Sequence, residues 1–148
     1  MKREPAKILL VEDNVDHIEL TTKALRENGM LNDIYVAEDG EEALDFLYRR
    51  KKYSDKTKAP RPGLILLDIK LPKIDGFEVL QKIKNDPDLK SIPVIMLTTS
   101  SREEEIVKGF ANGVNSYVTK PIDFNEFAAR IKSIGFYWTL INKLPKRM

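Results

Sequence analysis

The feature that most constrains the fold of this sequence is a regular alternation of short apolar runs with stretches of helical periodicity. The apolar runs are residues 7–11, 34–37, 64–67, 93–97 and 116–119. The stretches of helical periodicity are residues 15–28, 40–50, 76–85, 102–112 and 123–142. The first, third and fourth apolar runs contain almost no polar residue, which is typical of strands buried on both faces of a parallel sheet. The alternation therefore predicts an α/β fold with right-handed crossovers and helices on both faces of the sheet.

Length and composition exclude several classes of protein. The 148 residues fit one domain, and 42% hydrophobic with 32% charged residues is typical of a globular chain rather than a disordered one. The absence of cysteine excludes a disulfide scaffold, a zinc–cysteine site, an iron–sulfur cluster and a thiol nucleophile. The only histidine, His17, argues against a catalytic triad or a multi-histidine metal site, and we expect it to be an ordinary solvated residue.

The sequence shows no sign of a membrane or secretory segment. No apolar run approaches the roughly 18 residues needed to span a bilayer. The N-terminus passes directly into a strand-like run without the pattern of a signal peptide. We therefore expect a cytoplasmic protein with no contact to membranes.

Charge is unevenly distributed along the chain. The net charge of +2 argues against a general nucleic-acid binder, but residues 1–48 carry 5 basic and 12 acidic residues, whereas residues 49–63 carry 7 basic and 1 acidic. Residues 49–63 are also too long for an ordinary helix-to-strand connection, which takes about 2–6 residues. We expect the first residues of this basic insertion to extend the preceding helix and the remainder to form an exposed loop.

Polar side chains follow four of the predicted strands. They are Glu12, Asp13, Asp68, Thr98, Thr99 and Lys120. In open parallel sheets, ligands bind outside the carboxyl ends of the strands, so these side chains are expected to converge on one edge. Taken singly, each has an ordinary alternative: Asp13 or Asn14 caps a helix, Asp68 begins a turn, and the others are common strand-end or surface residues.

Taken together, these residue types favour one kind of chemistry. Three neighbouring carboxylates repel one another unless a cation joins them, and oxygen ligands favour a hard divalent ion such as Mg²⁺. A lysine and a hydroxyl beside the metal suit an incoming anion. A metal and a lysine that neutralise oxygens, with a carboxylate that attacks, are suited to phosphoryl transfer.

Four motifs in this order resemble the response-regulator receiver domain of two-component signalling. They are LLVEDN at residues 9–14, LLDIKLPKIDGF at 66–77, VIMLTT at 94–99 and YVTKP at 117–121. The resemblance covers residues 5–135. It implies a flavodoxin-like, doubly wound (βα)5 fold with a five-stranded parallel sheet of strand order 2-1-3-4-5.

The resemblance also implies a role for each motif residue. Asp68 is then the phosphoacceptor, Lys120 pairs with the phosphoryl oxygens, Thr98 is the switch hydroxyl and Tyr117 the coupled aromatic. The implied Mg²⁺ ligands are Asp13, Asp68, the backbone carbonyl of Lys70, and Glu12 through a metal-bound water, and Pro121 matches the family's cis-proline.

The basic insertion and the aromatic C-terminal extension resemble the single-domain regulators of cyanobacterial phytochrome-type histidine kinases. The resemblance implies a sensor histidine kinase as partner and a homodimer through the fourth helix, fifth strand and fifth helix, with Phe110, Tyr117 and the aromatic tail on that face. Alternatively, these aromatic residues complete the core. Residues 1–148 then form one receiver domain, with a core of 5–135, an insertion of 49–63 and an extension of 136–148.

With no output domain expected, the output is a contact with an unknown downstream protein, and the chain is a phosphoacceptor that promotes its own phosphotransfer and dephosphorylation rather than an enzyme. One alternative is a phosphohydrolase of the haloacid-dehalogenase type, which normally needs an aspartate where Lys70 stands. Another is a receiver-like protein that binds partners without phosphorylation. The insertion is either a solvated loop or a docking element for an acidic surface of the kinase, through Arg49, Arg50, Lys51 and Lys52.

Overall fold

The five apolar runs form one parallel β-sheet in the computed structural model, which describes residues 6–108 and 116–133. The strands are β1 (Ile8–Val11), β2 (Ile34–Ala37), β3 (Leu64–Asp68), β4 (Val94–Thr98) and β5 (Ser116–Thr119). Their order is β2-β1-β3-β4-β5, and all neighbouring pairs are parallel. The predicted doubly wound α/β fold and its strand order are confirmed.

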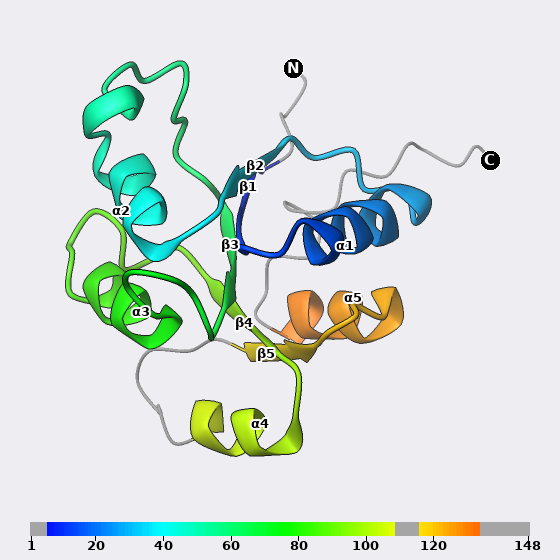
Figure 1. Ribbon diagram of the computed structural model, residues 1–148. Helices are drawn as coiled ribbons and strands as arrows, with labels where there is room; N and C mark the ends of the chain where they lie inside the picture. The colour runs from blue at the N-terminus through cyan, green and yellow to red at the C-terminus, as the bar shows by residue number, and fades with distance from the viewer. Residues whose placement is uncertain (1–5, 109–115, 134–148) are drawn as a thin grey trace.

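The helices cover both faces of this sheet. They are α1 (Val15–Glu27), α2 (Gly40–Tyr48), α3 (Gly76–Lys84), α4 (Ser101–Lys108) and α5 (Phe124–Ser133). Figure 1 shows α1 and α5 on one side of the sheet and α2 and α3 on the other. The predicted ends of the last two helices, residues 109–112 and 134–142, lie outside the described residues. Within residues 6–108 and 116–133, no helix combines the length and apolar character that crossing a membrane requires.

Alternating side chains of each strand enter two separate cores. On β1, Leu9 and Val11 pack toward α2 and α3, whereas Ile8 and Leu10 pack with residues of α1 and α5. All four are fully buried. Burial of a side chain of this size stabilises a fold by about 1.5–3 kcal/mol. The three central strands β1, β3 and β4, which are buried at every position, are therefore apolar along almost their whole length rather than at every second residue.

Asparagine and aspartate side chains begin three of the helices at the carboxyl edge of the sheet. The side chain of Asn14 accepts a hydrogen bond from the His17 N–H at 3.0 Å, and Asp39 and Asp75 do the same for α2 and α3. Such caps stabilise a helix by about 1 kcal/mol. Because Asn14 caps α1, Asp13 remains available at the edge of the sheet.

The basic insertion does not extend α2, so the expected helical extension is wrong, whereas the expected exposed loop is confirmed for most of its residues. Helix α2 ends at Tyr48 because Arg49 adopts the left-handed conformation, and a short 3-10 helix, Lys51–Tyr53, follows. The Tyr53 ring lies 5.2 Å from the ring centroid of Phe46 on α2, and Ala59 is buried. Apolar side chains within a polar segment thus attach the insertion to the core.

Candidate functional site

Three carboxylates converge at the carboxyl edge of the sheet. Glu12 and Asp13 follow β1, and Asp68 ends the adjacent strand β3. One carboxylate oxygen of each lies within 4.8 Å of the other two. Glu12 and Asp68 are buried, whereas Asp13 is exposed. The adjacency of β1 and β3 explains why residues more than fifty positions apart in the sequence share one site.

Lys120 joins this cluster from the end of β5. Its Nζ lies 2.8 Å from Oε1 of Glu12 and 3.1 Å from Oδ1 of Asp68. Its backbone N–H donates to the Thr98 carbonyl at 2.6 Å, and the peptide bond to Pro121 is cis. Only 6% of the Lys120 side chain is exposed. The structure therefore places the ammonium group between two buried carboxylates.

At this edge of the sheet, the described residues bring together more carboxylates than ammonium groups. Burial, and then the negative charge of Glu12, raise the pKa of Asp68 to about 7, although Lys120 opposes this. Burial alone lowers the pKa of Lys120, but its hydrogen bond to Glu12 and the nearby carboxylates raise that pKa overall. Among the described residues, Lys120 contacts two of the three carboxylates of the cluster, and this excess of oxygen ligands and negative charge suits a divalent cation.

The β3–α3 loop forms the outer wall of the site. A shallow cavity beside the cluster is lined by Asp13, Lys70 and Asp75 together with apolar loop residues. The Ile69 N–H donates to Oδ1 of Asp68 at 3.0 Å, which orients the carboxylate. The Lys70 side chain is exposed and points away toward Glu103, at 3.8 Å. Lys70 therefore contributes to this wall through its position directly after Asp68 and Ile69.

The predicted switch residues lie on the neighbouring strands. Thr98 ends β4, is fully buried, and its hydroxyl donates to the Val118 carbonyl at 3.4 Å. Tyr117 on β5 is half-buried, and the Arg130 guanidinium lies 4.9 Å from its ring centroid. The predicted aromatic residues Phe110 and 136–138 lie outside the described residues.

One contact near the site involves a residue that the sequence analysis missed. The buried carboxylate of Glu103 on α4 accepts hydrogen bonds from the N–H and the hydroxyl of Thr99, at 2.7 and 3.1 Å. The Glu103 N–H in turn donates to the Ser100 hydroxyl at 3.2 Å. A serine followed three residues later by glutamate is a sequence signal for a helix start, and it identifies this contact.

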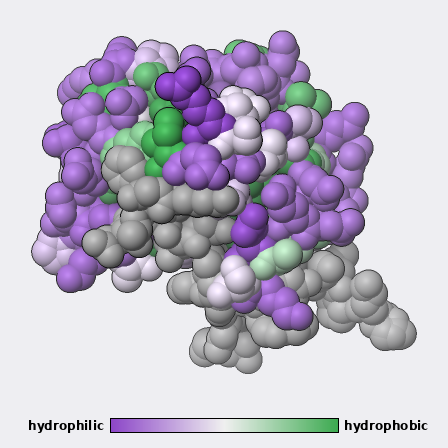
Figure 2. Space-filling model, turned by 90° about the horizontal axis from the view of Figure 1, so that it is seen from below, coloured by the Kyte–Doolittle hydropathy of each residue, from purple (hydrophilic) through white to green (hydrophobic). Residues whose placement is uncertain are grey.

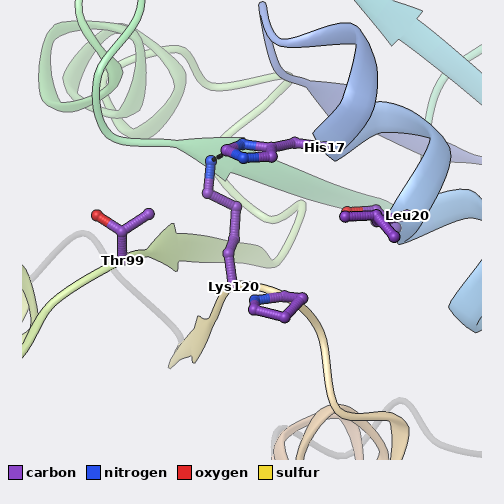
Figure 3. Close-up of a pocket in the computed structure, with 6 residues that line it drawn as sticks. His17, Leu20, Thr99 and Lys120 are labelled. Carbon is purple, nitrogen blue, oxygen red and sulfur yellow. Dashed lines mark hydrogen bonds between the residues drawn. The ribbon is translucent and has the colours of Figure 1, made fainter.

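His17 is not the ordinary solvated residue that the sequence analysis expected. Its Nδ1 lies 3.1 Å from Nζ of Lys120 and 3.8 Å from Oε2 of Glu12. Figure 3 shows the ring beside the end of the Lys120 side chain, with Thr99 on the other side of that chain. His17 and Lys120 also line a cavity with Leu20, Thr21, Thr99 and Pro121. No local sequence pattern indicates a contact between residues 103 positions apart.

Comparison with known families identifies the chain. The family model of the response regulator receiver domain matches residues 8–132, which contain the whole described site. The chain belongs to the response-regulator receiver family. Receiver domains act in phosphorelay signal transduction, so the enzyme alternative, a haloacid-dehalogenase-type phosphohydrolase, is not supported.

The receiver domain is similar to regulators of phytochrome signalling. Response regulator Rcp1 of Synechocystis sp. is 38% identical over 95% of this chain and 94% of its own length. The solved structure of the bacteriophytochrome response regulator AtBRR is 45% identical, with a TM-score of 0.85 over 95% of this chain and 99% of that chain. The phosphorylated cyanobacterial phytochrome response regulator RcpA is 40% identical, with a TM-score of 0.73 over 96% of this chain and 99% of that chain.

Proposed function

We propose that this protein is a stand-alone response regulator that accepts a phosphoryl group from the phosphohistidine of a sensor histidine kinase onto Asp68. The observation that carries the proposal is the position of the Asp68 carboxylate. It lies at the open carboxyl edge of the sheet, is oriented by the Ile69 N–H, and contacts the Lys120 ammonium at 3.1 Å. Lys120, Thr98 and Tyr117 take the roles that the family resemblance implies.

A divalent cation, which we propose to be Mg²⁺, fits the same edge. Asp13, Asp68 and the Lys70 carbonyl would hold it, with Glu12 acting through a bound water. The three carboxylates within 4.8 Å and the raised pKa of Asp68 support such a site, and a structure of the relative Rcp1 is described as Mn²⁺-bound. When bound, the cation neutralises phosphoryl oxygens, and carboxylate oxygens with several waters are the ligands Mg²⁺ prefers.

The residues of the chain account for the transfer itself. An Asp68 oxygen attacks phosphorus in line, and an O–P bond forms as the P–N bond to the donor histidine breaks. The bond electrons leave with the imidazole, which then takes a proton. Lys120 neutralises charge on the phosphoryl oxygens. Water later cleaves the acyl phosphate and restores Asp68, a dephosphorylation that the protein promotes itself.

Phosphorylation is proposed to change a protein-binding face. The Thr98 hydroxyl, which donates to the Val118 carbonyl in this structure, would turn to the phosphoryl group, and Tyr117 would shift beneath Arg130. The α4–β5–α5 face would then change its affinity for a second copy or for a downstream protein. This is a two-state element biased by a local change in charge.

The surface around α4 is mainly polar, which favours a protein interface made through polar contacts. Figure 1 places α4 at the bottom of the molecule, and Figure 2 shows that the described part of the face seen from below is mainly hydrophilic with small separate hydrophobic groups. Ile106 on α4 is a large hydrophobic side chain that is 44% exposed. A homodimer through α4–β5–α5 would therefore rest on polar contacts around a small apolar centre within the described residues.

The relatives support a proposal for the organisation and partners of the chain. Residues 1–148 are proposed to form one receiver domain, with a core of 5–135, the insertion and the C-terminal extension. Bacteriophytochrome and phytochrome regulators among its relatives favour a phytochrome-like histidine kinase as partner. The cytoplasm, where such a kinase becomes phosphorylated from ATP, is the proposed location.

The proposal is tested by phosphorylation with phosphoramidate and Mg²⁺, followed by intact mass measurement. The wild type is expected to gain one phosphoryl group, and Asp68→Asn to gain none. Asp88→Asn is the matched control, because Asp88 is exposed in the α3–β4 connection at the opposite edge of the sheet. Phosphorylation of Asp68→Asn at the wild-type rate contradicts the assignment.

A second measurement tests the switch and the dimer together. Light scattering with and without beryllofluoride and Mg²⁺ is expected to show a change in mass on addition of both. If no phosphodonor and no beryllofluoride alters the protein, the alternative of a receiver that binds partners without phosphorylation is supported instead.

A further inference from the structure

Three acceptor atoms surround the Lys120 ammonium group, two in hydrogen bonds and the Asp68 oxygen in an ion pair. Its Nζ lies 2.8 Å from Oε1 of Glu12, 3.1 Å from Oδ1 of Asp68 and 3.1 Å from Nδ1 of His17. An ammonium nitrogen donates three hydrogen bonds and accepts none. Nδ1 of His17 is therefore the acceptor, and the proton of the neutral ring is on Nε2.

The third acceptor matters because Lys120 is buried. Its side chain is only 6% exposed, so water has little access to an unpaired N–H. A buried polar group without a partner costs about 1–3 kcal/mol. Loss of the His17 nitrogen would therefore leave the ammonium with two anchors and freedom to turn.

The backbone of His17 is linked to Glu12 through Asn14. The Asn14 side chain accepts a hydrogen bond from the backbone N–H of His17 at 3.0 Å, and the backbone N–H of Asn14 donates to Oε2 of Glu12 at 3.2 Å. The ring is 38% exposed and faces the cavity drawn in Figure 3. The start of α1 thus fixes Glu12 and His17 relative to each other, and the His17 side chain lies outside the two cores.

We propose that His17 is a positioning residue that, together with Glu12, aims the third N–H of Lys120 at the Asp68 oxygen. The bonds of an ammonium group are tetrahedral, so fixing two N–H directions fixes the third. Glu12 and His17 supply these two directions. This inference rests on the proposed function, because the aimed N–H is useful only if a phosphoryl group arrives at Asp68.

Two variants of nearly equal side-chain size distinguish the effect of losing the hydrogen-bond acceptor from the effect of losing the volume of the ring. His17→Asn places an amide oxygen where Nδ1 lies, and His17→Leu places a methyl group there. Full-length proteins are compared by the rate of phosphorylation with phosphoramidate at increasing Mg²⁺. His17→Leu is expected to react about 3- to 10-fold more slowly than the wild type, and His17→Asn to remain within about twofold of it.

The Mg²⁺ dependence distinguishes positioning from general damage. The Mg²⁺ concentration that gives half the maximal rate is expected to be the same in all three proteins, because His17 acts on Lys120. A variant with a displaced acidic edge would change this concentration as well. Equal rates for the leucine and asparagine variants, whether fast or slow, overturn the proposal.

A readout independent of phosphorylation keeps this inference separate from the proposed function. The ¹⁵N-labelled lysine ammonium signal of Lys120, assigned by its loss in Lys120→Arg, is measured without divalent cation. We expect to observe the Lys120 signal in the wild type and in His17→Asn. In His17→Leu, we expect exchange of the ammonium protons with water to broaden it. An unchanged signal in His17→Leu overturns the inference, whereas failure of the wild type to become phosphorylated overturns only the proposed function.

Discussion

Two groups of charged side chains in this protein differ in how their charges are balanced. At the carboxyl edge of the sheet, one buried lysine contacts Glu12 and Asp68 beside a third carboxylate, and the pKa of Asp68 is raised to about 7. On α2, by contrast, each acid faces a base of the insertion. These pairs are Arg50–Asp45 at 3.1 Å, Lys51–Glu41 at 3.2 Å and Lys52–Glu42 at 3.2 Å, and in each of them the basic side chain is at least half exposed.

The difference explains the uneven charge of the sequence. Three bases of the insertion, Arg50, Lys51 and Lys52, pair with acids of α2, so part of the positive charge of residues 49–63 is balanced by the acidic first third. Arg49 also has a partner, since its Nε donates to the Ala59 carbonyl at 3.0 Å. A kinase-docking role for Arg49, Arg50, Lys51 and Lys52 would require these contacts to open. Exposed ion pairs contribute little to stability, so a run of charged residues does not by itself indicate a functional site. A buried group of charges without equal opposite charge does indicate one.

The largest expected difference between the two regions concerns removal of one lysine. Lys120→Met should lower the rate of phosphorylation with phosphoramidate by about 10²–10³-fold, because a buried group that neutralises transition-state charge is lost. Lys51→Met, in the insertion, should leave that rate unchanged. Similar losses in both variants would break the distinction between the catalytic edge and the insertion.

A second difference concerns stability without a divalent cation. Asp68→Asn removes a buried carboxylate whose pKa is raised by burial and then by Glu12, so it should increase the free energy of unfolding at pH 8 by roughly 1–3 kcal/mol. The folded wild type holds a proton on Asp68 more tightly than the unfolded chain does, so wild-type stability falls as pH rises from 3.8 to about 7.

Urea unfolding of both proteins in chelator at pH 5 and pH 8 measures this effect. The gain from Asp68→Asn should be larger at pH 8 than at pH 5, and saturating Mg²⁺ should reduce it. An equal gain at both pH values would show that the charge of Asp68 is not the cause.

A smaller effect is expected at Tyr53, where the insertion contacts α2. Burial, and then its hydrogen bond to Glu42, raise the pKa of Tyr53 to about 12. Because the folded state keeps this proton longer, its contribution to stability is present below about pH 10 and lost as pH rises toward 12. Tyr53→Phe should therefore be slightly less stable than the wild type at pH 8, by less than about 1 kcal/mol.

The difference between wild type and Tyr53→Phe should shrink at pH 11. An ultraviolet titration should also show that the phenolate transition missing from Tyr53→Phe is the most alkaline one. A transition near pH 10 for Tyr53 would mean that the insertion does not pack on α2 as described.

The smallest effect is expected from Lys51→Glu, which opposes Glu41 and Asp45 with a like charge. Thermal unfolding should show a small loss of stability that decreases in 1 M salt, since exposed pairs are screened. The loss should be smaller than the gain from Asp68→Asn. A large, salt-independent loss would mean that the insertion depends on its charges as the carboxyl edge does.

The sequence predicted the parts of the site that follow from regular structure. Glu12, Asp13, Asp68 and Lys120 each follow an apolar run, and the carboxyl ends of parallel strands share one edge, so their convergence could be predicted. The contact of His17 with Lys120 could not, because it depends on the exact start of α1 and on the distant strand β5. The packing of Tyr53 on Phe46 was missed for a similar reason, since polar neighbours concealed an aromatic contact.

The sequence by itself determined the alternation of strands and helices, the edge at which the polar residues meet and the family to which the chain belongs. These follow from local periodicity and from motifs that are contiguous in the chain. The tertiary structure alone decided which charges balance one another. Coulomb interactions depend on distance and burial rather than on sequence separation, so the buried Lys120 and the exposed Lys51 became distinguishable only in the folded protein.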